Sequence, residues 1–298
     1  MAAGAGAEPR VGPRRGHATR TPTSATATVG SAATIPAMTS IEPWNQAAGL
    51  AERRDARRRP ELAALPADRL PTIAELFTFA RDAELRFDTL RMRIEERTAT
   101  TRGDHLVSVE LLLRHPGEAQ ITTTEPDGGT RGNYELWLSD GATVRTYAAV
   151  HNLGTKRPAR MAVRGLDDPD LPGTSKVYVP LTDLPMETLP ETFVHPAGYC
   201  QNVLATGRCR VTGTDTIVDR QVIVVTSDHP RTIEMAADRP DFTIEVAFDR
   251  ADGTLLRLVE RIGGRITREA TAVVYAPDAP LPPTAFNFAF PSNARMLY

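Results

Sequence analysis

The sequence predicts a mainly β protein of the α+β class: a curved antiparallel sheet, or an unclosed β-barrel, of about eleven strands with one principal helix packed in its concave face. The main observation is that hydrophobic residues recur with a period of two along most of the chain, as in half-buried strands. Short turns rich in Gly and Asp separate these runs, and one stretch alone shows a clear helical period.

The N-terminal segment, residues 1–66, consists mostly of Ala, Thr, Ser, Pro and Arg, with few large apolar side chains. Ordering such a segment costs backbone entropy that little buried surface can offset, so we expect it to be disordered and the folded domain to span 67–298. The first 60 residues carry a net charge of +5 and the remainder −7. An acidic folded part argues against nucleic-acid binding.

Membrane and export signals are weak in this sequence. The longest apolar runs are only a few residues long, whereas a membrane helix needs roughly 20, so no transmembrane span is expected. Arg14 and Arg15 are not followed by a hydrophobic block, so no signal peptide is recognisable. From these residues alone the location is unknown, with the cytoplasm as the default expectation.

The expected helix covers about residues 72 to 86. Thr72 has the character of an N-cap, and Glu75, three residues later, can complete a capping box. Apolar residues follow at helical spacing, which predicts one amphipathic helix.

After this helix the period changes from 3.6 to 2, and short turns connect the runs. Connections this short join neighbouring strands antiparallel, because parallel crossovers need a dozen or more residues. The expected strands lie at 90–94, 107–113, 134–138, 209–217, 221–226, 232–236, 242–248, 255–262 and 266–275. Between His151 and Gly198 the chain is rich in proline, which predicts a long loop region with one short strand at 176–179 and a helical turn near 197–205.

The two cysteines, Cys200 and Cys209, are nine positions apart. A disulfide between them would close a small loop and stabilise the fold by roughly 2 to 3 kcal/mol in the loop-closure account. Two buried thiols that never meet, and a redox or metal role, are the alternatives. The spacings of a zinc site are absent, so no metal site is predicted.

Motifs for catalysis are also absent. The sequence has no nucleophile elbow, no dinucleotide-binding glycine motif and no phosphate-binding loop, and its six histidines are not paired by any motif. We therefore expect no cofactor and do not favour an enzyme.

The order of elements resembles a known family. An amphipathic helix runs into Phe87–Met92, and a tryptophan-bearing strand is followed by a hairpin. The stretches that carry the resemblance are Phe87–Met92, Tyr134–Gly141, Val144–Tyr147, Val211–Gln221, Phe248–Arg257 and Phe286–Pro291. They resemble the LolA/RseB-like superfamily of lipoprotein carriers and periplasmic sensors. This resemblance implies an unclosed antiparallel barrel around an apolar cavity, with helices in its mouth, and a location outside the cytoplasm. One departure is Asp219, where relatives often have Gly; a tight turn is still expected there, since Asp tolerates positive φ.

Two functions are therefore considered first. The leading one is non-enzymatic binding of an apolar ligand, such as an acyl chain, a lipid or a lipoprotein anchor, in the half-barrel cavity. The alternative is a regulatory or protein-interaction module of the RseB-like sensor type, in which the same surface binds a protein segment; an enzyme or a purely structural domain would be further possibilities. The residues expected to line the cavity are Leu76, Phe77, Met92, Leu111, Leu136, Trp137, Phe242, Ile244, Val246 and Phe248. Plain core residues would show the same alternation.

Overall fold

The computed structural model describes residues 62–125, 133–159, 180–231 and 239–297. The expected strands at 176–179 and 232–236 lie outside these residues, as does the N-terminal segment up to residue 61, whose disorder stays a prediction. Residues 62–66 are described, although the prediction placed them in the disordered segment. Arg86 Nη2 donates to the Ala63 carbonyl at 2.9 Å and Arg250 Nη2 to the Pro66 carbonyl at 2.7 Å, so these five residues belong to the folded part.

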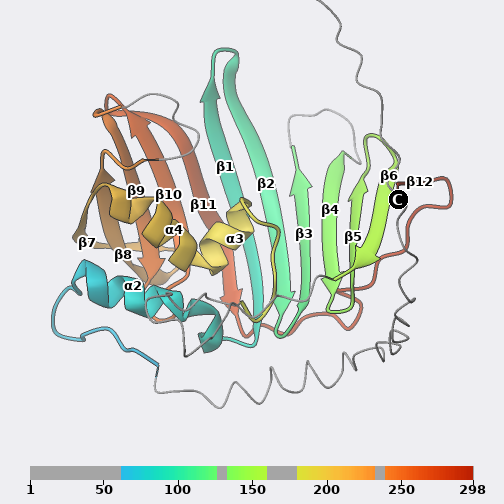
Figure 1. Cartoon of the computed structure of the whole chain (residues 1–298), viewed down its shortest axis with the longest axis horizontal. Helices are drawn as coiled ribbons and strands as arrows, with labels where there is room; N and C mark the ends of the chain where they lie inside the picture. Colours follow the sequence, from blue (N-terminus) through green and yellow to red (C-terminus); the bar gives the residue numbers. More distant parts are fainter. Residues whose placement is uncertain (1–61, 126–132, 160–179, 232–238, 298) are drawn as a thin grey trace, which may run out of the picture. The chain divides into compact units, whose positions relative to one another are not determined.

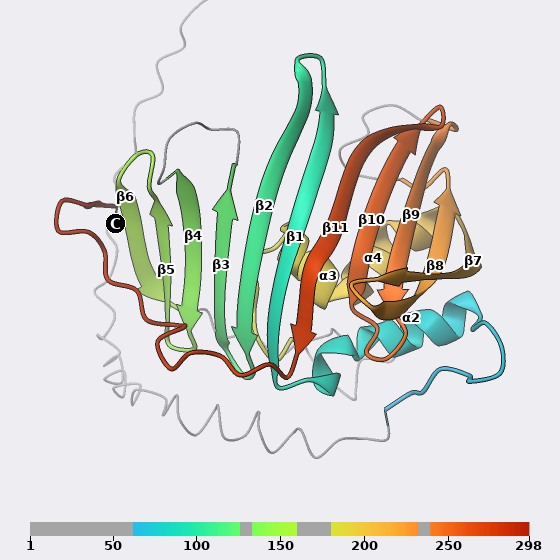
Figure 2. The same ribbon diagram turned by 180° about the vertical axis from the view of Figure 1, so that it is seen from behind.

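The described strands form one sheet of twelve strands, which confirms the mainly β class and the unclosed antiparallel sheet (Figures 1 and 2). Their order in the sheet is β12-β6-β5-β4-β3-β2-β1-β11-β10-β9-β8-β7. Every pairing is antiparallel except β12 with β6. The strands are β1 (Thr89–Thr100), β2 (Gly103–Arg114), β3 (Glu118–Thr124), β4 (Tyr134–Asp140), β5 (Thr143–Ala148), β6 (Leu153–Pro158), β7 (Arg208–Ile217), β8 (Arg220–Asp228), β9 (Phe242–Asp249), β10 (Leu255–Ile262), β11 (Arg265–Pro277) and β12 (Arg295–Leu297).

The predicted helix begins as expected. Helix α2 spans Ile73–Arg81, and the capping box is present: Thr72 Oγ1 accepts from Glu75 N at 3.3 Å, and Glu75 Oε2 accepts from Thr72 N at 2.8 Å. The helix ends earlier than predicted, at Asp82, and the chain continues as the 3₁₀ helix η1 (Ala83–Arg86).

Two further helices follow the proline-rich region, where only a helical turn was predicted. They are α3 (Leu189–Val194) and α4 (Pro196–Asn202), followed by the 3₁₀ helix η2 (Leu204–Thr206). Pro190 and Pro196 stand in the first turns of α3 and α4, where proline is tolerated because the missing N–H has no helical partner.

The three α-helices among the described residues lie on one face of the sheet, which we call the concave face (Figures 1 and 2). In Figure 1, α4 lies in front of β9 and β10, and α3 lies in front of β11 and β1. Helix α2 crosses the lower ends of the strands on the β7 side. Strands β3–β6 have no helix over either face among the described residues. The concave face is therefore divided into a half that helices cover and a half that they do not.

The main core lies between the sheet and these helices. Strand register aligns its residues in rows across the sheet, and one such row runs from Met92 through Leu111 and Ile121 to Trp137. On β1 the residues between the core positions point to the opposite face and are exposed arginines and a glutamate. The period of two in the sequence thus follows from a sheet with one apolar and one polar face.

The turn between β7 and β8 forms as expected at Asp219, which has a φ of 60°. Val218 beside it also has a positive φ, 43°, which is unusual for a β-branched residue.

A second, smaller cluster lies on the opposite, convex face. It combines Leu136, Leu138 and Tyr147 with Phe288 and Phe290. The two phenylalanines belong to residues 278–294, which we call the strap. In Figure 2 the strap (red) runs from the end of β11 past the lower ends of the neighbouring strands to the β6 edge.

The strap leads into β12. This strand pairs with β6 in parallel, whereas the other pairings of the described sheet are antiparallel. Asn152 Nδ2 donates to the Asn293 carbonyl at 2.7 Å, and Arg295 N donates to the Asn152 carbonyl at 2.9 Å. Gly154 leaves room for the strap, since a Cβ there would lie 2.5 Å from a ring carbon of Phe290. The strap is thus fitted closely against β6.

Candidate functional site

The candidate site is the concave face, and nine of the ten predicted lining residues do meet there in one cluster. Seven of them are buried, whereas Phe77 and Trp137 are half-buried. The nine are Leu76, Phe77, Met92, Leu111, Trp137, Phe242, Ile244, Val246 and Phe248.

Leu136 does not join this cluster. Leu136 and Trp137 are consecutive in β4, and consecutive strand residues point to opposite faces. Leu136 accordingly lies in the convex cluster with the strap. The expectation that both side chains line one cavity conflicts with the period of the strand.

Under the helices, the concave face is filled by the protein's own side chains. Leu76 on α2 and Ile244 and Phe248 on β9 are all 0% exposed. The Phe77 and Phe248 rings are 6.4 Å apart, so helix α2 packs against β9. In this half of the face the predicted lining residues are core.

The uncovered half begins at Trp137. Its row continues to Thr146 on β5 and Thr155 on β6, whose hydroxyl groups are 2.6 Å apart. All three side chains are half-buried. The two threonines were missed at the sequence level, although the hairpin at Ser139–Gly141 would have placed Thr146 opposite Trp137.

A buried polar cluster holds the helical segment to the sheet. The carboxylate of Glu84, on η1, accepts the Leu181 N–H at 2.8 Å and lies 3.1 Å from His195 Nε2, between α3 and α4. His115, in the β2–β3 turn, places its Nε2 4.0 Å from the same carboxylate and its Nδ1 2.8 Å from Thr182 Oγ1. These contacts join four separate segments of the chain, so the helices over the concave face are fixed by polar groups as well as by apolar packing.

A second buried polar network lies at the β9–β10 turn. Arg220 pairs with both oxygens of Asp249 at 2.7 and 2.8 Å, and the Tyr275 hydroxyl donates to Asp252 at 2.8 Å. Burial, and then the charge of Asp249, raise the pKa of Asp252. Gly253 in this turn has a φ of +87° and lies against α2, so the network positions that helix rather than facing the uncovered half.

Both cysteines are free thiols in the structure, in contrast to the predicted disulfide. Cys200 is buried on α4, and Cys209 is half-buried on β7. Burial raises the pKa of the Cys209 thiol to about 11 and that of Cys200 further, to which the neighbouring Cys209 contributes. Neither thiol has the lowered pKa of a reactive cysteine, and their bridging stays a prediction.

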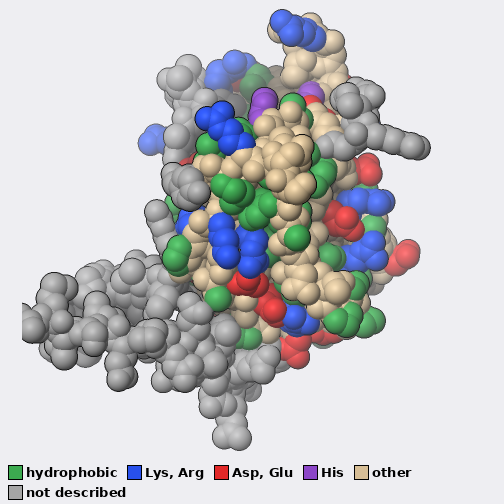
Figure 3. Space-filling model, turned by 90° about the vertical axis from the view of Figure 1, so that its right-hand side faces the viewer, with side chains coloured by type: hydrophobic (Ala, Val, Ile, Leu, Met, Phe, Trp, Pro, Cys, Tyr) green, Lys and Arg blue, Asp and Glu red, His purple; other side chains and the backbone are tan. Residues whose placement is uncertain are grey.

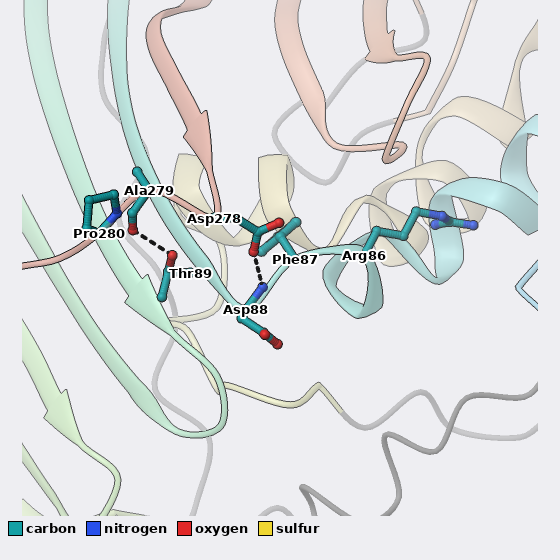
Figure 4. A pocket seen from close by; sticks show the side chains of 7 residues that line it. All are labelled: Arg86, Phe87, Asp88, Thr89, Asp278, Ala279 and Pro280. Atoms are coloured by element: carbon teal, nitrogen blue, oxygen red, sulfur yellow. Dashed lines mark hydrogen bonds between the residues drawn. The ribbon is translucent and has the colours of Figure 1, made fainter.

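A pocket of about 390 Å³ lies away from the concave face, where η1 leads into β1 and β11 leads into the strap (Figure 4). Its lining includes Arg86, Asp88 and Asp278, and the Asp278 carboxylate accepts the Asp88 N–H at 2.7 Å. Arg86 is already bonded to backbone carbonyls of three other segments. This pocket is polar and does not correspond to the apolar cavity that the sequence predicted.

Among the described residues, no group of three or more His, Cys, Asp or Glu side chains is arranged to hold a metal ion. Within the same residues, no helix has the length and apolar character needed to cross a membrane.

No protein-family model matches the chain, and a search of curated protein sequences finds no relative. Solved structures are similar at low identity. MucB is 12% identical, with a TM-score of 0.43 over 73% of this chain and 62% of MucB, so the chain spans less than two thirds of MucB. A LolA superfamily protein from Nitrosomonas europaea is 11% identical, with a TM-score of 0.29 over 73% of this chain and 98% of that protein. The lipoprotein LppX from Mycobacterium tuberculosis is 11% identical, with a TM-score of 0.37 over 70% of this chain and 97% of LppX. At these identities and TM-scores the similarity carries no conclusion about the function of this chain.

Proposed function

We propose that the concave face binds an apolar ligand, such as an acyl chain, without catalysing a reaction. The observation that supports this proposal is the continuation of the apolar row beyond the helices. Met92, Leu111 and Ile121 are buried, and the next member of the row, Trp137, is half-buried where no described helix covers the sheet. An apolar chain laid along this row would remove the indole and its neighbours from water.

The resemblance to exported lipoprotein carriers and sensors goes with this function, and we propose a location outside the cytoplasm as part of it. The cytoplasmic default has no support beyond the absence of a recognisable signal.

A second candidate function is the binding of a protein segment on the same face. The observation that favours it is the filling of the covered half by buried side chains such as Leu76 and Phe248. A ligand there would have to compete with the protein's own residues, whereas an extended segment could bind across the uncovered strands alone.

The test uses the two tryptophans. With Trp44→Phe, Trp137 becomes the sole indole, and its emission reports on the uncovered half of the concave face. We expect titration with a fluorescent fatty-acid ester to give saturable energy transfer from Trp137.

Thr146→Glu should abolish this binding, because it places a charge beside Trp137 in the path of an apolar chain. Thr122→Glu is the matched control: Thr122 is also half-buried, but it is the partner of Leu136 and points to the convex face. Equal loss in both variants, or no saturable transfer in the parent, would refute apolar binding on this face. Saturable binding of extended apolar peptides in place of the ester would then support the second function.

A further inference from the structure

The outer rim of the concave face, along β6 and β12, carries arginines that have no acidic partner in the part of the chain that the structure describes. Strand register places Arg157 opposite Val144, in the row of Leu113 and Ala119, and therefore on the concave face. Arg295 is the partner of Leu153, which lies in the row of Val109 and also faces the concave side.

Both arginines are exposed, and no hydrogen bond or ion pair of either side chain occurs among the described residues. Arg145 shows the contrast: it points to the convex face and is paired with Asp140 at 2.7 Å. On the concave side of β3–β6, Glu135 is the single acidic residue in the described strands. It lies three strand spacings, about 14 Å, from Arg295.

Leu297 and Thr155 lie between the two arginines. Leu297, on β12, is the partner of Thr155 and is 43% exposed. The pair formed by Thr155 and Leu297 is about 7 Å along the strands from each arginine, within the reach of both side chains. Figure 3, which faces this edge, shows Lys and Arg side chains beside hydrophobic ones near the middle of the view, with Asp or Glu side chains directly below them. A basic rim is unexpected on residues 61–298, whose net charge is −7.

We infer that the ligand of the concave face is an amphiphile with an anionic head group, bound with its apolar chain over Trp137 and its head between Arg157 and Arg295. This inference rests on the proposed function. The row from Thr155 through Thr146 to Trp137 leads from the rim toward the apolar core, so head and tail would each meet matching chemistry. A guanidinium binds a carboxylate or a phosphate oxygen pair through parallel hydrogen bonds, so either head group fits.

The experiment compares dansyl-undecanoic acid with its methyl ester, using energy transfer from Trp137 in the full chain carrying Trp44→Phe. The two probes share the same tail and differ in charge. We expect the acid to bind about tenfold more tightly than the ester, because two partly exposed ion pairs together supply an effect of that size. The difference in affinity between acid and ester should shrink as the sodium chloride concentration is raised.

Arg157→Gln and Arg295→Gln should each weaken binding of the acid by about threefold, and the double variant should bind acid and ester equally. Lys156→Gln is the matched control. Lys156 is the exposed neighbour of Arg157 but points to the convex face, so the preference should persist. Circular dichroism checks that each variant is folded.

The outcomes separate the two proposals. Two results would overturn the anionic head group while leaving apolar binding intact. One is equal binding of acid and ester by the parent protein. The other is a loss of the preference for the acid in Lys156→Gln as large as in the arginine variants. Binding of neither probe would overturn both. A dodecyl phosphate competitor tests whether the rim accepts phosphate as well as carboxylate. Vesicles containing phosphatidylglycerol test a further outcome. If they bind in a manner that depends on Lys156 as well as on Arg157 and Arg295, and the protein binds acid and ester equally, the rim is a membrane-docking surface and the inference is wrong.

Discussion

Removing the carboxylate of Glu84 should weaken the attachment of the helices to the sheet. In Glu84→Leu the Leu181 N–H and His195 lose an acceptor at 2.8 and 3.1 Å in a site where Glu84 is 1% exposed. Each buried donor that loses its acceptor costs about 1 to 3 kcal/mol, and the added apolar surface offsets about 1 kcal/mol. Two such donors, less this offset, should lower the free energy of unfolding by about 1 to 5 kcal/mol. Glu84→Gln retains one acceptor oxygen, so it should lose about 1 to 2 kcal/mol.

The measurement is urea unfolding followed by circular dichroism. The dependence of the unfolding free energy on urea concentration must be the same in each variant, so that the midpoints report stability. Glu110→Gln is the control, since Glu110 is an exposed carboxylate whose contact with Arg91 measures 3.4 Å. This control should change stability by no more than about 0.5 kcal/mol. The reasoning fails if Glu84→Leu costs no more than Glu110→Gln.

Three further predictions concern other parts of the fold. Gly207→Ala should lower the free energy of unfolding by about 1 to 3 kcal/mol, because a Cβ there would lie 2.7 Å from a backbone carbonyl oxygen. Gly213→Ala in β7 is the control, since a Cβ at that position meets nothing within 4 Å. Equal melting temperatures of the two variants would contradict this prediction. The Glu75 pKa is lowered to about 2 by its guanidinium partner and the capping box, so the stability that it contributes is present above about pH 4.5 and lost as pH falls toward 2. The stability gap between the parent and Glu75→Gln should therefore close between pH 5 and 2, and a gap unchanged at pH 2 would refute that origin. Oxidised glutathione in mild denaturant should bridge Cys200 and Cys209 and lower the intact mass by two hydrogens, whereas recovery of both thiols as glutathione adducts would show that they do not meet.

Much of the fold could be predicted because its causes are local. Thr72 and Glu75 form a capping box with no help from the rest of the chain, and the alternation in β1 or β9 follows from one buried face. The parallel pairing of β12 could not be predicted, because three residues carry no period and their partner lies about 140 positions earlier.

The candidate site was predicted less completely. Apolar alternation identified the buried rows, but a cavity wall and a core have the same pattern, so the covered half of the face could not be told from the uncovered half. Trp137 was among the predicted lining residues, whereas Arg157 was not, because its lack of an acidic partner in the described residues appears only when neighbouring strands are aligned. Leu136 was misplaced by treating two consecutive strand residues as lining one surface.

The strap has a consequence for the order in which the molecule can be completed during synthesis. Strands β4–β6 are made early, yet the convex cluster over them is closed by Phe288 and Phe290, which emerge after all of β11. Until then Leu136, Leu138 and Tyr147 form an apolar patch on an otherwise polar face, next to a β6 edge that has no strand beside it. A nascent chain is thus exposed to edge-to-edge association from the synthesis of β6 until the strap and β12 have been made. The strap removes that hazard only when it docks.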